Sequence, residues 1–381
     1  MTEEKPQTGR RWVDVARWVG FALCAGLFVR TLAQADLASA WTRIQAIGPV
    51  VLVCLLPFPV ALFMDAWAWH GLLRAIGRKT RLGLLFRLRF AIEAVTNSAP
   101  VGPLWADALA PILLTRHTDV PAADAFATIV AKRWVVVRMH ATYVALTGAF
   151  GATAILRASQ VLLHNDSLLV GVFTAALFLA VLAIVFQLLV SKGGLGGRIS
   201  ARLAKWKRIS SWVESRRHHF SRADTQLAKL SADHWVNATA SWRMLGLWFF
   251  EGLETWVILK LLGVQLTVVE VLSFDAALSV VRSIAMFGAP SGIGVQDVGY
   301  LAVLRAYGVA DADTVGPAFV VLKRIKEALW MAVGFVILAR SGPRALAEAR
   351  LAVKVEEEEL AREAKRLARP SQDPQPPSAA T

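Results

Sequence analysis

The segment that restricts the fold most is residues 168–190, an apolar run without a single ionisable side chain. A helix that spans a bilayer needs about 20 consecutive, mostly apolar residues, and this run provides them. Comparable apolar runs occur at residues 12–31, 49–76, 134–156, 238–262 and 315–338. We therefore predict an all-α, polytopic helical membrane protein, with six spans in a membrane domain of residues 1–340.

Composition and charge agree with this class. Of the residues, 56% are hydrophobic and 18% are charged, whereas soluble proteins average about 25% charged. The net charge of +14 concentrates in loops between the apolar runs, as the positive-inside rule predicts for cytoplasmic loops. We therefore expect no nucleic-acid partner.

The largest of these loops is residues 191–233, where ten lysines and arginines face three acidic residues. Its apolar residues recur at helical spacing, which indicates basic amphipathic helices. Two interpretations are open: a cytoplasmic loop that merely follows the charge rule, or a surface that binds anionic lipids or a partner.

The ends of the chain are expected in the cytoplasm. Lys5, Arg10 and Arg11 precede the first apolar run, and a basic cluster that includes Arg81 and Arg89 follows the second. We expect the first helix to stay uncleaved, although a signal peptide is the alternative. Residues 341–381 form a polar tail whose Pro/Ser/Gln-rich end is expected to be disordered.

A second constraint is an internal repeat. The pattern Ala-Pro-x-Gly-x-x-x-x-Asp begins at Ala99 and again at Ala289, and each matched position lies 190 residues after its counterpart. A Lys-Arg pair follows each copy, as Lys132-Arg133 and Lys323-Arg324. Self-similarity at this distance indicates two copies of one structural unit.

Each copy interrupts an apolar segment, at residues 90–114 and 272–307. Pro100 and Pro290 remove a backbone donor, while Gly102, Gly292 and Gly294 permit turns that other residues resist. Lipid offers no hydrogen bonds, so freed backbone groups must line a protein-enclosed or wet cavity.

Both interrupted segments are therefore predicted to be re-entrant helix pairs. Counting the spans between them places the first pair on the cytoplasmic side and the second on the outside. The two repeats would then be inverted, an arrangement associated with alternating access around a midplane site.

Ionisable residues inside apolar runs are functional candidates because their burial in lipid is costly. Lys132, Arg133, Lys323 and Arg324 are candidates for holding an anionic lipid headgroup. Snorkelling to the membrane interface is the alternative for the first two. Ser291, Gly292 and Gly294 lie where a new helix start would point its N–H groups at such an anion.

The acidic candidates have two interpretations each. Asp107 and Asp297 fall in the first turns of the helices after the breaks, where they could cap those helices or carry a proton or a cation. Glu251 and Glu254 could take part in the same coupling, or could form salt bridges with the membrane-embedded bases.

Motifs typical of catalytic, phosphate-binding or metal-binding sites are missing from the sequence. It has no phosphate-binding Gly-rich loop ending in Gly-Lys-Ser/Thr, no Cys-x-x-Cys and no metal-spaced histidine pair. We therefore expect no catalytic residues, no metal and no cofactor, and we do not expect an enzyme. The sequence does not specify an oligomeric state.

Three parts of the sequence match motifs of a known family. They are the residues around Pro100, Gly102 and Asp107, the run from Pro290 to Asp297, and the Lys323-Arg324 helix with Trp330 and Gly334. The chain resembles a flippase-like family that includes the transmembrane region of lysylphosphatidylglycerol synthases and hopanoid-associated membrane proteins. One departure is that Ala110 and Pro111 stand where the family often has a basic residue.

The resemblance implies a protein of the bacterial cytoplasmic membrane that moves a lipid between leaflets or membranes. An anionic phospholipid, a polyprenyl-linked lipid and a hopanoid are the candidate substrates. Two other functions stay open: a membrane enzyme that modifies a lipid headgroup with Asp107 and Asp297 as acid and base, and a scaffold for envelope-lipid synthesis that docks partners through residues 191–233.

Overall fold

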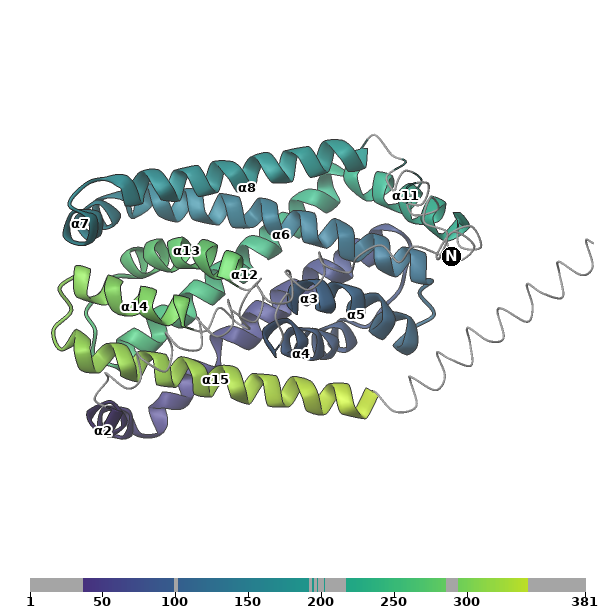
Figure 1. Ribbon diagram of the computed structural model, residues 1–381. Helices are drawn as coiled ribbons and strands as arrows, with labels where there is room; N and C mark the ends of the chain where they lie inside the picture. Colours follow the sequence, from purple (N-terminus) through teal and green to yellow (C-terminus); the bar gives the residue numbers. More distant parts are fainter. Residues whose placement is uncertain are drawn as a thin grey trace, which may run out of the picture. The chain divides into compact units, whose positions relative to one another are not determined.

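The computed structural model describes residues 37–98, 102–191, 194, 197, 202, 217–285 and 294–341. The predicted first span, most of the basic loop and the tail lie outside these residues, as do Pro100, Pro290, Ser291 and Gly292. Every regular element in the described part is helical (Figure 1), which confirms the all-α class. The account that follows concerns the compact unit Met1–Phe335; of the second unit, Val336–Thr381, residues 336–341 are described and are helical.

The described residues of the first half of the chain form a short surface helix, a 3₁₀ segment and six further helices. They are α2 (Leu37–Ile47), η1 (Gly48–Leu55), α3 (Pro57–Ala75), α4 (Leu82–Ser98), α5 (Gly102–His117), α6 (Ala122–Phe150), α7 (Ala152–Leu163) and α8 (Ser167–Ser191). The second half contributes α11 (Arg217–Ala232), α12 (His234–Leu261), α13 (Val268–Ala285), α14 (Val295–Ala306) and α15 (Ala312–Ser341). The order α3-α4-α5-α6 thus recurs as α12-α13-α14-α15.

Both predicted breaks separate two helices. α4 ends at Ser98 and α5 begins at Gly102, while α13 ends at Ala285 and α14 begins at Val295. The two glycines serve different purposes. A Cβ on Gly102 would lie 1.9 Å from the carbonyl oxygen of Thr96, so this glycine allows a close backbone approach. Gly294, directly before α14, has a φ of +85°, which favours glycine.

Each broken helix pair has an end away from its break, and these ends of the two pairs lie at opposite ends of α6. The first pair ends beside the start of α6, because Arg78, between α3 and α4, binds Asp124 with 2.7 Å between Nε and Oδ2. The second pair ends beside the finish of α6, where Ser273 of α13 lies against Gly151. Tyr307, just after α14, contacts Phe274 edge-on at 5.7 Å between ring centroids. Insertion from opposite faces of the membrane stays a prediction.

The predicted span at residues 134–156 contains a bend. α6 runs from Ala122 to Phe150, and α7 then turns by 81°. The turn falls at Gly151, where a Cβ would lie 2.3 Å from that of Ser273. A larger residue would push α13 away, so the close contact with the second broken pair accounts for the glycine.

In the part of the chain that the structure describes, two helical segments, Ala38–Ala75 and Ser167–Val190, are long and apolar enough to cross a membrane, and the bent pair α6–α7 is a third if it counts as one span. α12 and α15 are also long, but each carries buried charges, such as Glu254 and Lys326. α3 packs along α12, and α6 packs along α8 (Figure 1). The interior between the two repeats is therefore polar, while α8 presents an apolar surface.

The described part of the basic loop is α11, which packs against α6 and α8. Ala223, Leu227 and Leu230 are buried there. Arg222 adds an ion pair to Asp124, with 2.8 Å between Nε and Oδ1. This part of the loop is thus attached to the helix bundle at the start of α6.

Candidate functional site

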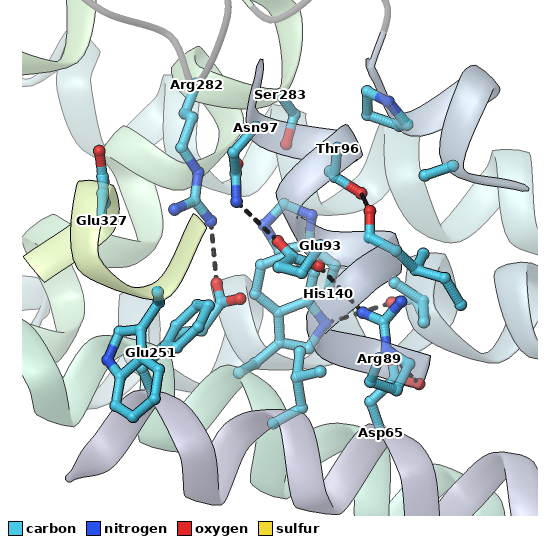
Figure 2. Close-up of a pocket in the computed structure, with 18 of the residues that line it drawn as sticks. Asp65, Arg89, Glu93, Thr96, Asn97, His140, Glu251, Arg282, Ser283 and Glu327 are labelled. Atoms are coloured by element: carbon cyan, nitrogen blue, oxygen red, sulfur yellow. Dashed lines mark hydrogen bonds and ion pairs between the residues drawn. The ribbon is translucent and has the colours of Figure 1, made fainter. Parts of the chain in front are cut away.

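A cavity of about 420 Å³ lies between the two repeats (Figure 2). Helices of both repeats line it, and α8 contributes Leu179 and Leu182. Among the described residues, its charged lining consists of seven carboxylates and six bases: Asp65, Glu93, Asp107, Glu251, Glu254, Asp275 and Glu327, with Arg89, Lys132, Arg133, Arg282, Lys323 and Lys326. A buried charge is costly unless it is paired and hydrogen-bonded, so the pairing of these groups determines what the cavity can bind.

Asp65 of α3 is the acidic centre of the first repeat. One of its oxygens lies 2.7 Å from Nζ of Lys132 and 3.0 Å from Nε of Arg89. Arg89 also reaches Glu93, with 3.0 Å between Nη2 and Oε2 (Figure 2). Three helices are joined here, because Asp65 belongs to α3, Arg89 and Glu93 to α4, and Lys132 to α6. Lys132 is therefore a buried ion-pair partner.

Asp107 and Arg133 form the outer pair of the same repeat. Arg133 donates from Nε and Nη2 to the two oxygens of Asp107, at 2.7 and 2.6 Å. This fork geometry is the one that arginine also uses for phosphate. The Arg133 side chain is 44% exposed, so a phosphate could reach it. Within the described residues, no hydrogen bond from a backbone N–H to Asp107 is found.

The second repeat pairs Asp297 with Arg324 in the corresponding places. Nη2 of Arg324 lies 2.6 Å from Oδ1 of Asp297, and Oδ2 of Asp297 accepts a hydrogen bond of 3.0 Å from the backbone N–H of Gly294. Asp297 therefore caps α14 and also neutralises Arg324. Neither residue belongs to the lining of the cavity, and both lie directly behind its wall through the contact of Arg324 with Glu327.

Glu251 and Glu254 of α12 both form ion pairs, with different partners. Glu254 accepts from Lys326 at 2.6 Å and lies 4.0 Å from Nζ of Lys323. Glu251 instead binds Arg282 of α13 at 2.9 Å (Figure 2). The structure thus places Glu254 with the bases of α15, while Glu251 holds the second broken pair to α12.

Several lining residues were missed by the sequence reasoning. Arg89 was predicted only as a member of the basic cluster after residues 49–76, whereas the structure buries it against Asp65 with 7% exposure. The other charged residues missed are Asp65, Glu93, Asp275 and Arg282, with His140 beside them. Each of Asp65, Asp275 and Arg282 lies within a predicted apolar segment, and an ionisable residue there is the signal that would have identified them.

Among the described residues, no group of three or more His, Cys, Asp or Glu side chains is arranged to hold a metal ion. His140 is hydrogen-bonded to Ser279, at 2.7 Å between Nε2 and Oγ, and stacks on Trp248 at 3.9 Å between ring centroids. These contacts fix the packing of α6 on α12 and α13.

An α-helical bundle with membrane-spanning segments and a cavity of paired charges at its centre defines an integral membrane protein. Residues 17–335 match the family described as the lysylphosphatidylglycerol synthase TM region, and the chain belongs to this family. The resemblance in the sequence is thereby confirmed, and it relates the protein to lipid-modifying and lipid-handling membrane proteins. No curated protein matches the chain.

Proposed function

We propose that this protein moves a lipid between leaflets or between membranes, with the headgroup in the charged cavity. The observation that carries the proposal is that one cavity has both a charged and an apolar wall. Asp65, Lys132 and Arg133 lie on the charged side, while Leu179 and Leu182 come from the apolar helix α8. An amphiphile fits such a cavity because each of its two parts meets a surface of its own kind.

The size of the cavity indicates which part of the lipid enters. Drug-sized ligands occupy pockets of roughly 300–1,000 Å³, and about 420 Å³ is at the small end of this range. A headgroup fits within it, whereas two acyl chains do not. We infer that the chains stay in the bilayer and pass alongside α8, where Leu182 is 47% exposed.

A headgroup phosphate would compete for the bases that carboxylates hold here. Arg133 is the first candidate because its guanidinium is partly exposed and already oriented in a fork. Lys132 and Lys323 lie deeper in the same cavity. An anionic phospholipid and a polyprenyl phosphate both carry such a phosphate, and the hydroxyls of a hopanoid could bind the carboxylates.

Opposed broken pairs supply the movement in this proposal. The ends of α4–α5 and α13–α14 lie at opposite ends of α6, so each pair is suited to close one side of the cavity. The cytoplasmic membrane of a bacterium is the proposed location, with both termini in the cytoplasm and residues 191–233 on an anionic lipid surface.

The test is leaflet exchange of fluorescent phosphatidylglycerol and phosphatidylethanolamine in proteoliposomes that contain the full chain. We expect exchange with the wild type and its loss with Arg282→Gln, which removes a cavity base. Arg305→Gln is the matched control, because Arg305 pairs with Asp313 on the exposed surface of the same repeat. Exchange that is equal in all three proteins would contradict the proposal.

The same vesicles separate this function from the alternatives. Conversion of the labelled lipid into a new product, seen by mass spectrometry, would favour a headgroup-modifying enzyme with Asp107 and Asp297 as acid and base. No exchange and no product with any tested lipid class would favour the scaffold.

A further inference from the structure

We propose that Asp275 is a proton-binding site that couples lipid movement to a proton gradient, an inference that rests on the proposed transport function. Asp275 lies on α13, within the second broken pair, and lines the cavity. Its side chain is buried, with 7% exposure of the residue.

Asp275 differs from the other carboxylates of the cavity. Each of the other six has an ion pair with a lysine or arginine. Among the described residues, Asp275 has none within the 4.0 Å limit of an ion pair.

Two hydroxyl groups hold Asp275 in place. Oδ1 accepts from Oγ1 of Thr255 at 2.7 Å and from the hydroxyl of Tyr300 at 2.6 Å. Both hydroxyls in turn accept from Nζ of Lys323, at 3.4 and 3.1 Å. Two short routes of one hydroxyl each therefore connect the ammonium group of Lys323 to the carboxylate of Asp275.

This arrangement suits a proton and disfavours a metal cation. Sodium requires several oxygen ligands with free lone pairs, but Thr255 and Tyr300 direct their hydrogens at Oδ1. A proton needs only the carboxylate itself, and a neutral carboxyl is far less costly to bury than an unpaired carboxylate.

The charged and titratable groups around Asp275 come from every helix that packs on α13. They are Glu251 and Glu254 of α12, His140 and Tyr143 of α6, Tyr300 of α14, Lys323 and Lys326 of α15, and Arg282 of α13 itself. At the exposed start of α13, Arg157 of α7 forms an ion pair with Glu270. Glu251 and Glu254 have their own bases. The proton is therefore taken up at Asp275, and leaves it when α13 moves with the broken pair.

The coupling step is the binding and release of one proton by a carboxylate. A proton from the acidic side binds Oδ2 or Oδ1 of Asp275 and forms a carboxylic acid, and no other bond is made or broken. On the opposite side the O–H bond breaks, and the proton passes to water. Each cycle thus moves a proton together with one headgroup.

The experiment uses proteoliposomes with fluorescent phosphatidylglycerol in the membrane and a pH-sensitive dye inside. With the wild type we expect a proton gradient to accelerate leaflet exchange and lipid to stimulate proton entry. With Asp275→Asn, which keeps the hydrogen-bond acceptor, exchange with and without the gradient should become equal, and lipid-stimulated proton entry should be lost. Asp313→Asn, at an exposed position, should behave as the wild type does.

The outcomes distinguish the two proposals. Wild-type exchange that ignores the proton gradient, or that follows a sodium gradient instead, overturns the role of Asp275 and leaves transport intact. Absence of exchange overturns transport and the coupling with it. Infrared difference spectra between acidic and alkaline buffer give a readout without transport: the protonated-carboxyl band should be present in the wild type, lost in Asp275→Asn and retained in Asp313→Asn.

Discussion

Arg324 binds Asp297 at 2.6 Å across the second repeat as Arg133 binds Asp107 across the first. In both cases the acid lies just after the helix break, and the base lies on the next long helix. One ion pair therefore fixes the second half of each broken pair to its neighbour. The difference is exposure: the Asp297 side chain is 1% exposed, whereas that of Asp107 is 29% exposed.

This difference predicts unequal costs for removing the two acids. Asp297→Asn leaves Arg324 with Glu327 as its remaining acidic partner and weakens the start of α14, so we expect a loss of about 3 kcal/mol in the free energy of unfolding. Asp107→Asn removes an exposed pair, for which the expected loss is under about 1 kcal/mol. Denaturant unfolding in detergent measures both, and equal losses would contradict the prediction.

Asp65 should be needed for the stability of the folded protein because it neutralises two bases at once. Asp65→Asn leaves Lys132 and Arg89 facing each other without their shared acid, and we expect destabilisation of about 3–5 kcal/mol. Combining it with Lys132→Met removes one of the uncompensated charges, so the double variant should be more stable than Asp65→Asn alone. A double variant that is less stable than the single one would show that the pair is not the source of the effect.

Gly334 sets the distance between α15 and α4. A Cβ at this position would lie 2.3 Å from the carbonyl oxygen of Phe90 and 2.7 Å from Cβ of Ala94. Gly334→Ala should therefore push the helices apart, with a loss of about 1–3 kcal/mol and slower lipid exchange. Gly171→Ala on α8 is the control, because a Cβ there meets nothing within 4 Å. Its stability and exchange should match those of the wild type.

The attachment of α11 should depend on Arg222. Asp124 is buried at the start of α6 and binds both Arg222 and Arg78. Arg222→Gln should release the first turns of α11, which amide hydrogen exchange followed by mass spectrometry would detect as faster exchange there. Lys229→Gln, at an exposed position of the same helix, should leave the exchange rates of α11 unchanged.

Much of the fold was predictable because lipid restricts the choice of structure. Long apolar runs, Pro/Gly breaks and the 190-residue offset predicted an all-α protein with two interrupted segments. The bend after Phe150 was not predictable from Gly151 alone, since its cause is a contact with Ser273, far along the chain. Contacts of this kind have no local signature.

The candidate site was predicted in part for the same reason. The acids and the Lys-Arg pairs that follow the two breaks were predicted as site residues. The partner of each base was not predicted, because the pairing depends on how α3, α4, α12 and α13 face one another. Arg89 shows the limit most clearly. In the sequence it resembles the other arginines of the basic cluster that precede it, and only the packing of α4 against α3 brings it to Asp65.

The apolar character of α8 has a mechanical consequence. Along its length α8 presents no ionisable group, and its side chains on the cavity wall are leucines. In a bilayer, moving such a helix aside exchanges contacts with protein for contacts with acyl chains, and these differ little in free energy because lipid is as apolar as leucine. Water would make the same displacement costly. The membrane itself thus makes α8 the wall of the cavity that can yield sideways at the lowest cost.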